Sequence, residues 1–195
     1  MLRIIAGEFR SRRLLGPAEE EGSRPYPDRV KESVFNQLGE AVDNARVLDL
    51  FAGVGTVGLE AISRGAAAVL MVERSRDTFR RLERNIAALG CGDRATAMYG
   101  DALGQTCLLA APRPVDLLFV DPAYRMIRDP QSRQRVIDQV SRCREIMAET
   151  GLVVLRSPLG PKDADLSLPG FRGPEAHRYG PKMWVLFYEP YREPG

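Results

Sequence analysis

The chain of 195 residues is poor in the residues that build metal centres, disulfides and membrane spans. It has one histidine, His177, and three scattered cysteines, Cys91, Cys107 and Cys143. A histidine-based metal site or catalytic triad is therefore not expected, and the odd number of thiols suits a reducing cytoplasm. No run of eighteen apolar residues occurs, and the N-terminus turns charged at Arg3 without a signal-peptide core. We expect a cytoplasmic protein with no metal and no membrane segment.

Lysine is also scarce, since only three of the 28 basic residues are lysines. The net charge of +2 does not by itself indicate a nucleic-acid binder. The arginines, however, gather in the first fifteen residues and again directly after residue 124. Phosphate contacts are predicted there, from Arg3, Arg10, Arg12, Arg13, Arg125 and Arg128. The alternative is an arginine-rich protein that places these side chains on solvated faces.

Apolar segments of strand and helix type alternate from Arg46 onward. Strands are predicted near residues 47–50, 67–72, 95–99, 115–120 and 151–155, with a closing antiparallel pair at 172–178 and 183–188. Such alternation predicts an α/β fold with a mostly parallel, doubly wound sheet. Before it, residues 1–15 suggest a β-hairpin arm, and Asp28 is predicted to cap a helix that ends near Gly39.

The motif Asp121-Pro122-Ala123-Tyr124 directly follows the apolar run 115–120. It places a carboxylate, a backbone carbonyl and an aromatic face where open α/β sheets bind their ligands. The Asp121 carboxylate and the Pro122 carbonyl can accept both N–H bonds of an exocyclic base amine and so aim its lone pair. Tyr124 would stack on the base, for about 1–3 kcal/mol. The alternative is a simple Asp-Pro turn with Tyr124 in the core.

A glycine-rich loop follows the first predicted strand. Gly53, Gly55 and Gly58 have the G-x-G-x-x-G spacing that is typical of dinucleotide binding. Asp49, just before the loop, would repel a pyrophosphate but would suit the sulfonium and ammonium groups of S-adenosylmethionine. No hydride-transfer site follows, whereas residues 121–124 offer a methyl-acceptor site. S-adenosylmethionine is therefore the favoured cofactor, and a dinucleotide is the alternative.

Acidic residues end four successive predicted strands: Asp49, Glu73, Asp101 and Asp121. Glu73 is placed to bind ribose hydroxyls and Asp101 to bind an adenine amino group. One such acid is more often a helix cap or a solvated loop residue. Four of them at one edge of a sheet indicate a ligand site.

These segments together resemble the bacterial 16S rRNA guanine-N2 methyltransferases of the RsmD type, a class I S-adenosylmethionine-dependent family. The resemblance covers nearly the whole chain and rests on Arg3 to Gly7, Arg24 to Asn36, Leu48 to Ala61, Ser63 to Ala66, Val72-Glu73, Asn85, Asp101-Ala102 and Asp121 to Tyr124. It implies a Rossmann-like α/β fold with a mostly parallel seven-stranded sheet, an antiparallel C-terminal strand and a small N-terminal β-hairpin/helix extension. Residues 1–40 would form the extension and residues 41–195 the methyltransferase domain.

The resemblance also implies roles for individual residues. Asp121, Pro122 and Tyr124 would be catalytic. The cofactor would lie among Asp49, Phe51, Gly53, Gly55, Glu73, Arg74, Asp101, Ala102 and Asp121. The implied reaction is methyl transfer from S-adenosylmethionine to a guanine N2 amine of 16S ribosomal RNA, within a 30S particle or an assembly intermediate.

The sequence departs from the family pattern at two places. Ala123 stands where the family usually has a second proline, and Tyr26-Pro27 replace the usual threonines. Ala123 removes a ring that fixes φ but no group that does chemistry, so we expect activity to be retained. The bulk of Tyr26 would alter a lid over the cofactor. Two alternatives stay open: a catalytically weakened or silent RNA-binding or ribosome-assembly protein on this fold, and a DNA amino-methyltransferase.

Overall fold

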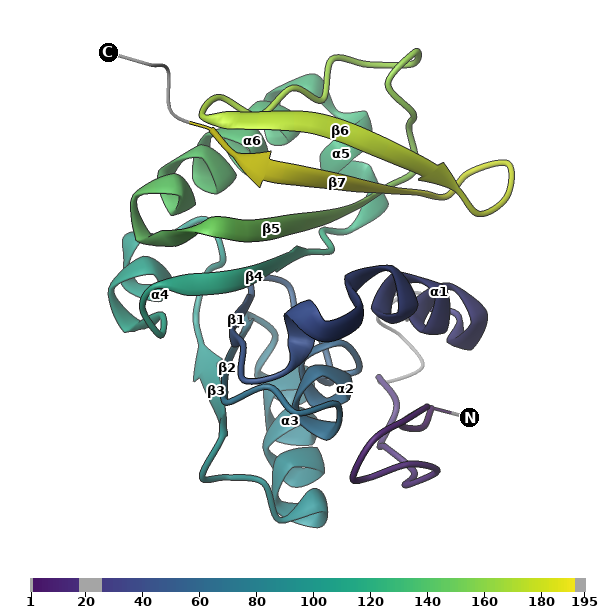
Figure 1. Ribbon diagram of the computed structural model, residues 1–195, viewed down its shortest axis with the longest axis vertical. Helices are drawn as coiled ribbons and strands as arrows, with labels where there is room; N and C mark the ends of the chain where they lie inside the picture. The colour runs from purple at the N-terminus through teal and green to yellow at the C-terminus, as the bar shows by residue number, and fades with distance from the viewer. Residues whose placement is uncertain (1, 18–25, 192–195) are drawn as a thin grey trace.

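The computed structural model describes residues 2–17 and 26–191 and contains one mixed sheet with helices on both faces (Figure 1). Its strands are β1 (Arg46–Asp49), β2 (Ala68–Glu73), β3 (Ala95–Tyr99), β4 (Val115–Val120), β5 (Met147–Ser157), β6 (Phe171–Arg178) and β7 (Trp184–Pro190). Its helices are α1 (Asp28–Leu38), α2 (Gly58–Ser63), α3 (Arg76–Leu89), α4 (Gln105–Ala110), α5 (Tyr124–Arg128) and α6 (Pro130–Cys143), with 3₁₀ turns η2 (Gly39–Val42) and η3 (Arg144–Ile146).

The seven strands follow the order β3-β2-β1-β4-β5-β7-β6. The first five are parallel, and β7 pairs antiparallel with both β5 and β6. The predicted α/β fold with a mostly parallel seven-stranded sheet and an antiparallel C-terminal strand is therefore confirmed. The chain runs outward from β1 to β2 and β3 and then crosses back to β4 on the other side of β1. The sheet therefore has its topological switch point between β1 and β4, where open α/β sheets bind their ligands.

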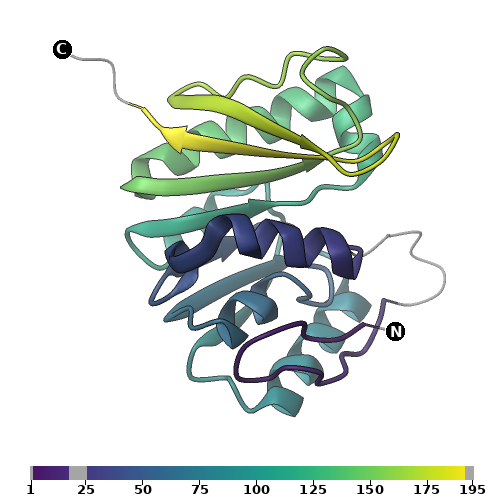
Figure 2. The ribbon, with the colours of Figure 1, turned by 45° about the vertical axis from the view of Figure 1, so that its right-hand side comes forward.

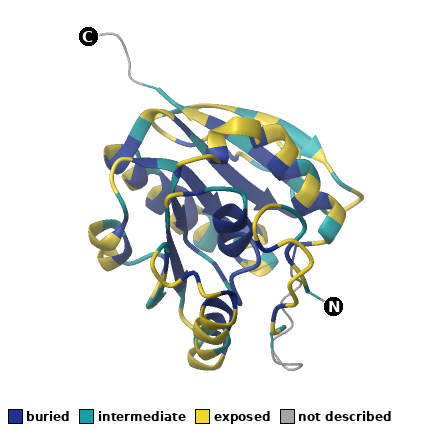
Figure 3. Cartoon of the chain, turned by 60° about the horizontal axis from the view of Figure 1, so that its bottom comes forward, coloured by how far each residue is buried: buried dark blue, intermediate teal, exposed yellow. Residues whose placement is uncertain are grey.

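Two hydrophobic clusters cover the two faces of the sheet. Helices α1, α2 and α3 pack on one face, and α4, α5 and α6 on the other. The central strands are buried on both sides, as Figure 3 shows in dark blue. Continuous apolar runs such as 117–120 are typical of parallel strands covered in this way. No helix within the described residues is long and apolar enough to cross a membrane.

The N-terminal arm lies against α2 and α3 (Figure 2). The predicted hairpin is present in a short form, with one antiparallel bridge between Arg3 and Arg13 and with backbone hydrogen bonds from Ile4 to Arg12, from Ser11 to Ile4 and from Leu14 to Leu2. The backbone donors in the middle of the hairpin bind α2 instead of a partner strand. The N–H groups of Ile5 and Ala6 bind the Glu60 carboxylate, and those of Glu8 and Phe9 bind Ser63.

The predicted cap of the first helix is wrong. Asp28 is the first helical residue, Pro27 occupies the cap position, and no side chain caps the helix. The Asp28 carboxylate instead pairs with the Arg3 guanidinium of the arm at 3.3 Å. Arm and helix share one hydrophobic cluster with α2 and α3, with Ile4, Phe9 and Val34 among its members. The domain boundary at residue 40 stays a prediction.

Candidate functional site at the carboxyl edge of the sheet

Three of the predicted acids meet at the carboxyl edge of the sheet, beside the switch point. Asp49 ends β1, Glu73 ends β2, and Asp121 directly follows β4. Asp49 pairs in register with Phe119, two residues before Asp121, and its charge interacts with both Asp121 and Glu73. The fold therefore brings these carboxylates together, as the parallel strands predict.

Asp49 is a buried carboxyl with an unused acceptor. Its side chain is 1% exposed, and its Oδ2 atom has no hydrogen-bond partner within the described part of the chain. Burial, reinforced by the charge of Asp121, raises the pKa of Asp49 to about 8, although the backbone N–H groups of Gly58 and Phe51 oppose the shift. A buried acceptor of this kind fits a ligand that carries positive charge and N–H donors, as S-adenosylmethionine does.

Glu73 fastens the glycine-rich loop to the sheet edge. Its Oε2 accepts from the Gly53 N–H at 3.1 Å, and its Oε1 accepts from the Ser75 N–H at 2.6 Å. The loop itself needs glycine at residue 55, where φ is +88° and an added Cβ would lie 2.5 Å from Leu82. Glu73 thus holds the loop in place, and its bond to ribose hydroxyls stays a prediction.

The remaining predicted cofactor residues surround this edge with different exposure. Phe51 is half-buried and packs on the core, whereas Ala102 is buried. Asp101 is exposed and accepts from the Leu103 N–H at 3.0 Å, and Arg74 is exposed. The roles of all four in cofactor binding stay predictions.

The acceptor motif lies beside Asp49 and contacts a buried arginine that the sequence analysis did not single out. Arg156 Nε, on β5, donates to Asp121 Oδ1 at 2.5 Å. The Arg156 guanidinium also lies 5.5 Å from the Tyr124 ring centroid and 4.5 Å from that of Tyr26. The sequence does contain a signal for Arg156, because it is a charged residue that directly follows the apolar run 152–155. The four acids were identified by the same kind of signal.

The Asp121 carboxyl titrates near neutral pH in this environment. Burial raises its pKa to about 6, and the guanidinium of Arg156 opposes that shift. At pH 7 most Asp121 side chains are therefore ionised and able to accept hydrogen bonds. Pro122 is buried, and Tyr124 is half-buried at the start of α5.

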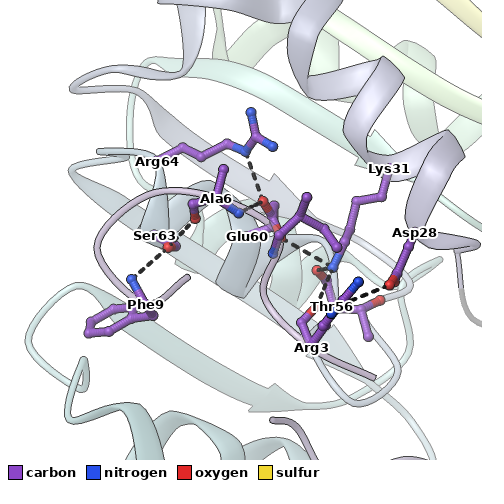
Figure 4. Close-up of polar contacts among 10 residues, drawn as sticks. Arg3, Ala6, Phe9, Asp28, Lys31, Thr56, Glu60, Ser63 and Arg64 are labelled. Atoms are coloured by element: carbon purple, nitrogen blue, oxygen red, sulfur yellow. Dashed lines mark hydrogen bonds and ion pairs between the residues drawn. The ribbon is translucent and has the colours of Figure 1, made fainter. Parts of the chain in front are cut away.

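A second buried charge cluster joins the extension to the helix that follows the glycine loop (Figure 4). Glu60 on α2 is fully buried and pairs with Lys31 at 3.2 Å and with Arg64 at 2.8 Å. Lys31 Nζ also donates to the Arg3 carbonyl at 2.9 Å. Burial lowers the pKa of Lys31, while Glu60 opposes this effect. The cluster joins α1 and the arm to Thr56 of the glycine-rich loop and to α2. The sequence analysis did not predict it.

The arginines predicted to contact phosphate are all exposed, but they differ in their partners. Arg3 pairs with Asp28, and Arg12 donates to the Ala88 carbonyl of α3. Arg128 lies 5.9 Å from the ring of Tyr124 on the helix that follows the acceptor motif. The others exposed on these segments are Arg10, Arg13 and Arg125. Their contact with RNA stays a prediction. In the part of the chain that is described, no group of three or more His, Cys, Asp or Glu residues could hold a metal ion.

Comparisons of sequence find one matching family and relatives that are named as rRNA methyltransferases. The family described as "Conserved hypothetical protein 95" matches residues 2–187. The chain is 40% identical over 124 residues to "Ribosomal RNA small subunit methyltransferase D" of Escherichia coli K12, covering 64% of this chain and 61% of that protein. It is 36% identical over 126 residues to the "Putative rRNA methyltransferase YlbH" of Bacillus subtilis, covering 64% of this chain and 67% of that protein. The match thus spans about three fifths of the length of the E. coli relative.

Comparisons of structure extend over almost the whole chain. A "Putative methyltransferase yhhF" of Escherichia coli superposes with a TM-score of 0.78 and 29% identity, covering 97% of each chain. A putative methylase of Haemophilus influenzae gives a TM-score of 0.73 with 26% identity, covering 98% of this chain and 99% of that chain. The chain therefore belongs to the family described as "Conserved hypothetical protein 95", the RsmD-type methyltransferases.

Proposed function

We propose that the protein transfers a methyl group from S-adenosylmethionine to the exocyclic N2 amine of a guanine in 16S ribosomal RNA. The observation that carries the proposal is the juxtaposition of Asp121 with Asp49 at the switch point, since Asp49 has an unused buried acceptor and Asp121 begins the acceptor motif. The names of the relatives supply the substrate class. We place the reaction in the cytoplasm, on a 30S particle or an assembly intermediate.

The cofactor would lie over the glycine-rich loop. Asp49 would accept from the positively charged amino-acid end, Glu73 would bind the ribose, and Asp101 the adenine amino group. S-adenosylmethionine, when bound, supplies a methyl group on a positively charged sulfur. The chain contributes a loop whose shape is fixed by Gly55 and Glu73, so that little ordering is left for the moment of binding.

The target base would enter beside Tyr124, flipped out of its surroundings. Asp121 and the Pro122 carbonyl would accept hydrogen bonds from the two N–H groups of the amine and aim its lone pair. Positioning of this kind lowers barriers by roughly 7–11 kcal/mol in favourable cases. Ala123 leaves these groups in place, and its φ of −53° and ψ of 135° lie where a proline could also stand.

The test is methyl transfer from labelled S-adenosylmethionine to 30S particles and to free 16S rRNA, followed by nucleoside identification. We expect N2-methylguanosine with the natural chain and none with Asp121→Ala, whose cofactor affinity should stay within about tenfold because Asp121 acts on the acceptor. Asp138→Ala, which removes an exposed carboxylate of α6, is the matched control with full activity.

Ala123→Pro separates an enzyme from a silent binder. We expect turnover to be preserved or modestly raised, because the substitution stiffens a loop whose functional groups are already present. Binding of RNA without transfer by the natural chain, with transfer restored by Ala123→Pro, would show that the substitution has silenced the enzyme. Label on DNA or on an adenine would refute the proposed substrate.

A further inference from the structure

Arg156 is a buried cation that the proposed reaction has not used. Arg156 lies near the end of β5 and is 6% exposed, and its Nε donates to Asp121 Oδ1 at 2.5 Å. The rings of Tyr26 and Tyr124 both contact its guanidinium, at 4.5 Å and 5.5 Å from their centroids. An arginine held at one carboxylate oxygen and by two aromatic rings has little freedom to move.

The charges around Asp121 come from four elements. Arg156 pairs with it from β5, and the charge of Asp121 acts on Asp49 at the end of β1 and on Tyr26 before α1. Tyr124 of α5 lies beside the Arg156 guanidinium. The guanidinium of Arg156 pairs with the half-buried Asp121, whose charge in turn acts on the buried Asp49. Without the guanidinium, burial would favour the protonated form of Asp121, in which one oxygen carries an O–H donor instead of accepting from an amine.

We propose that Arg156 is the positioning residue of the acceptor site, which holds Asp121 ionised and fixes its carboxylate through Oδ1 while Oδ2 accepts from the target amine. This inference rests on the proposed methyl transfer. Charge and geometry act together here. The ion pair keeps the acceptor charged at neutral pH, and the hydrogen bond to one oxygen sets the plane in which the other oxygen lies.

Tyr26 gains a role from the same contacts. It stands where the family usually has a threonine, and its ring is buried against the guanidinium and faces the acceptor motif. Burial, the main cause, and the charge of Asp121 raise the pKa of Tyr26 well above its ordinary value, so the ring stays neutral. Tyr26, which the sequence analysis treats as a bulkier residue of a lid, therefore packs against the guanidinium of Arg156.

The first experiment is a pH profile of methyl transfer at saturating S-adenosylmethionine, with Arg156→Met and Arg156→Lys. The natural chain should lose activity below a midpoint near pH 6, where Asp121 becomes protonated. Arg156→Met should move that midpoint upward by about 1–3 pH units, because an adjacent cation lowers a carboxyl pKa by about that amount. Activity lost at pH 7 should therefore return at pH 9, with cofactor affinity within about threefold.

Arg156→Lys keeps the positive charge but not the planar fork. Its midpoint should stay close to that of the natural chain, with a lower kcat at every pH. Should Arg156→Met fail to fold, Arg156→Gln gives the same comparison, since it keeps a donor without a charge. The matched control is Arg46→Met, which breaks the Arg46–Asp116 pair where β1 and β4 begin and should leave the midpoint unchanged.

The second experiment needs no activity. The ¹³C signal of the Asp121 carboxyl, assigned with Asp121→Asn, should titrate near pH 6 in the natural chain and at higher pH in Arg156→Met. An unchanged titration, or an acid midpoint shared by both chains, would overturn the role of Arg156 while leaving the proposed reaction intact. Absence of methyl transfer at any pH, with the expected shift in the carboxyl signal, would instead overturn the proposed function alone.

Discussion

Binding of S-adenosylmethionine should release a proton from Asp49. In the ligand-free protein, burial holds the pKa of this carboxyl at about 8, so at pH 7 about nine in ten Asp49 side chains are protonated. A cation placed beside a carboxylate lowers its pKa by about 1–3 units. The bound state therefore favours the ionised form, and cofactor binding and loss of the Asp49 proton are coupled.

The size of the coupling follows from the two pKa values. With a shift of about two units, from 8 to about 6, binding at pH 7 should release about 0.8 proton. The same shift makes the cofactor bind about 50-fold more tightly at pH 9 than at pH 6. S-adenosylhomocysteine, which lacks the positively charged sulfur, should show a smaller release.

Calorimetry in buffers of different ionisation enthalpy measures the released proton directly. Asp49→Asn, which keeps the shape but cannot titrate, is the control and should remove most of the proton release. A release below about 0.1 proton at pH 7, or one that Asp49→Asn leaves unchanged, would refute the assignment of Asp49 to the cationic end of the cofactor.

Three further outcomes are expected. Glu73→Ala should weaken S-adenosylmethionine binding by about 1–3 kcal/mol in calorimetry, whereas tight binding of NADH with no response to S-adenosylmethionine would favour the dinucleotide alternative. Glu60→Gln should lower the free energy of unfolding by about 3–5 kcal/mol in urea, because it leaves Lys31 buried without its partner; Glu8→Gln, at the more exposed Arg94 pair, is the control and should cost less than about 1 kcal/mol. Joint neutralisation of Arg10, Arg12 and Arg13 should lower the salt slope of RNA binding by about one unit per phosphate contact, with cofactor affinity unchanged. An unchanged slope would show that these three residues only form a solvated face.

The strands were predictable because their apolar runs are continuous and short. The third predicted strand, 95–99, coincides with β3, and the closing pair matches β6 and β7 within a few residues. The fifth strand was predicted too short, since β5 begins at Met147. Its first residues include Glu149 and Thr150, which are exposed and carry no apolar signal. Pairing of Met147 with Val115 on β4 extends the strand there, and this partner lies far away in the sequence.

The N-terminal extension was less predictable, because its backbone donors are satisfied by side chains from a distant helix. Glu60 and Ser63 bind the N–H groups in the middle of the hairpin, whose two ends are joined by a few backbone hydrogen bonds. Asp28 is the first residue of α1 and pairs with Arg3 of the arm instead of capping the helix. A local capping rule has no access to such a partner. The segment with Arg24 and Pro25, on which part of the family resemblance rests, lies outside the described residues.

The charge at the carboxyl edge gives a reason for a cationic methyl donor. Asp49 is buried, and the half-buried Asp121 pairs with the guanidinium of Arg156 on β5, so these three groups together are neutral only when one carboxyl is protonated or a second cation is present. Protonated Asp49 gives this neutrality in the ligand-free protein at pH 7. S-adenosylmethionine would replace the proton with its own positive charge, whereas the product has one positive charge fewer. Loss of that charge returns the carboxyl pair to an unbalanced state, which favours uptake of a proton by Asp49 and release of the product.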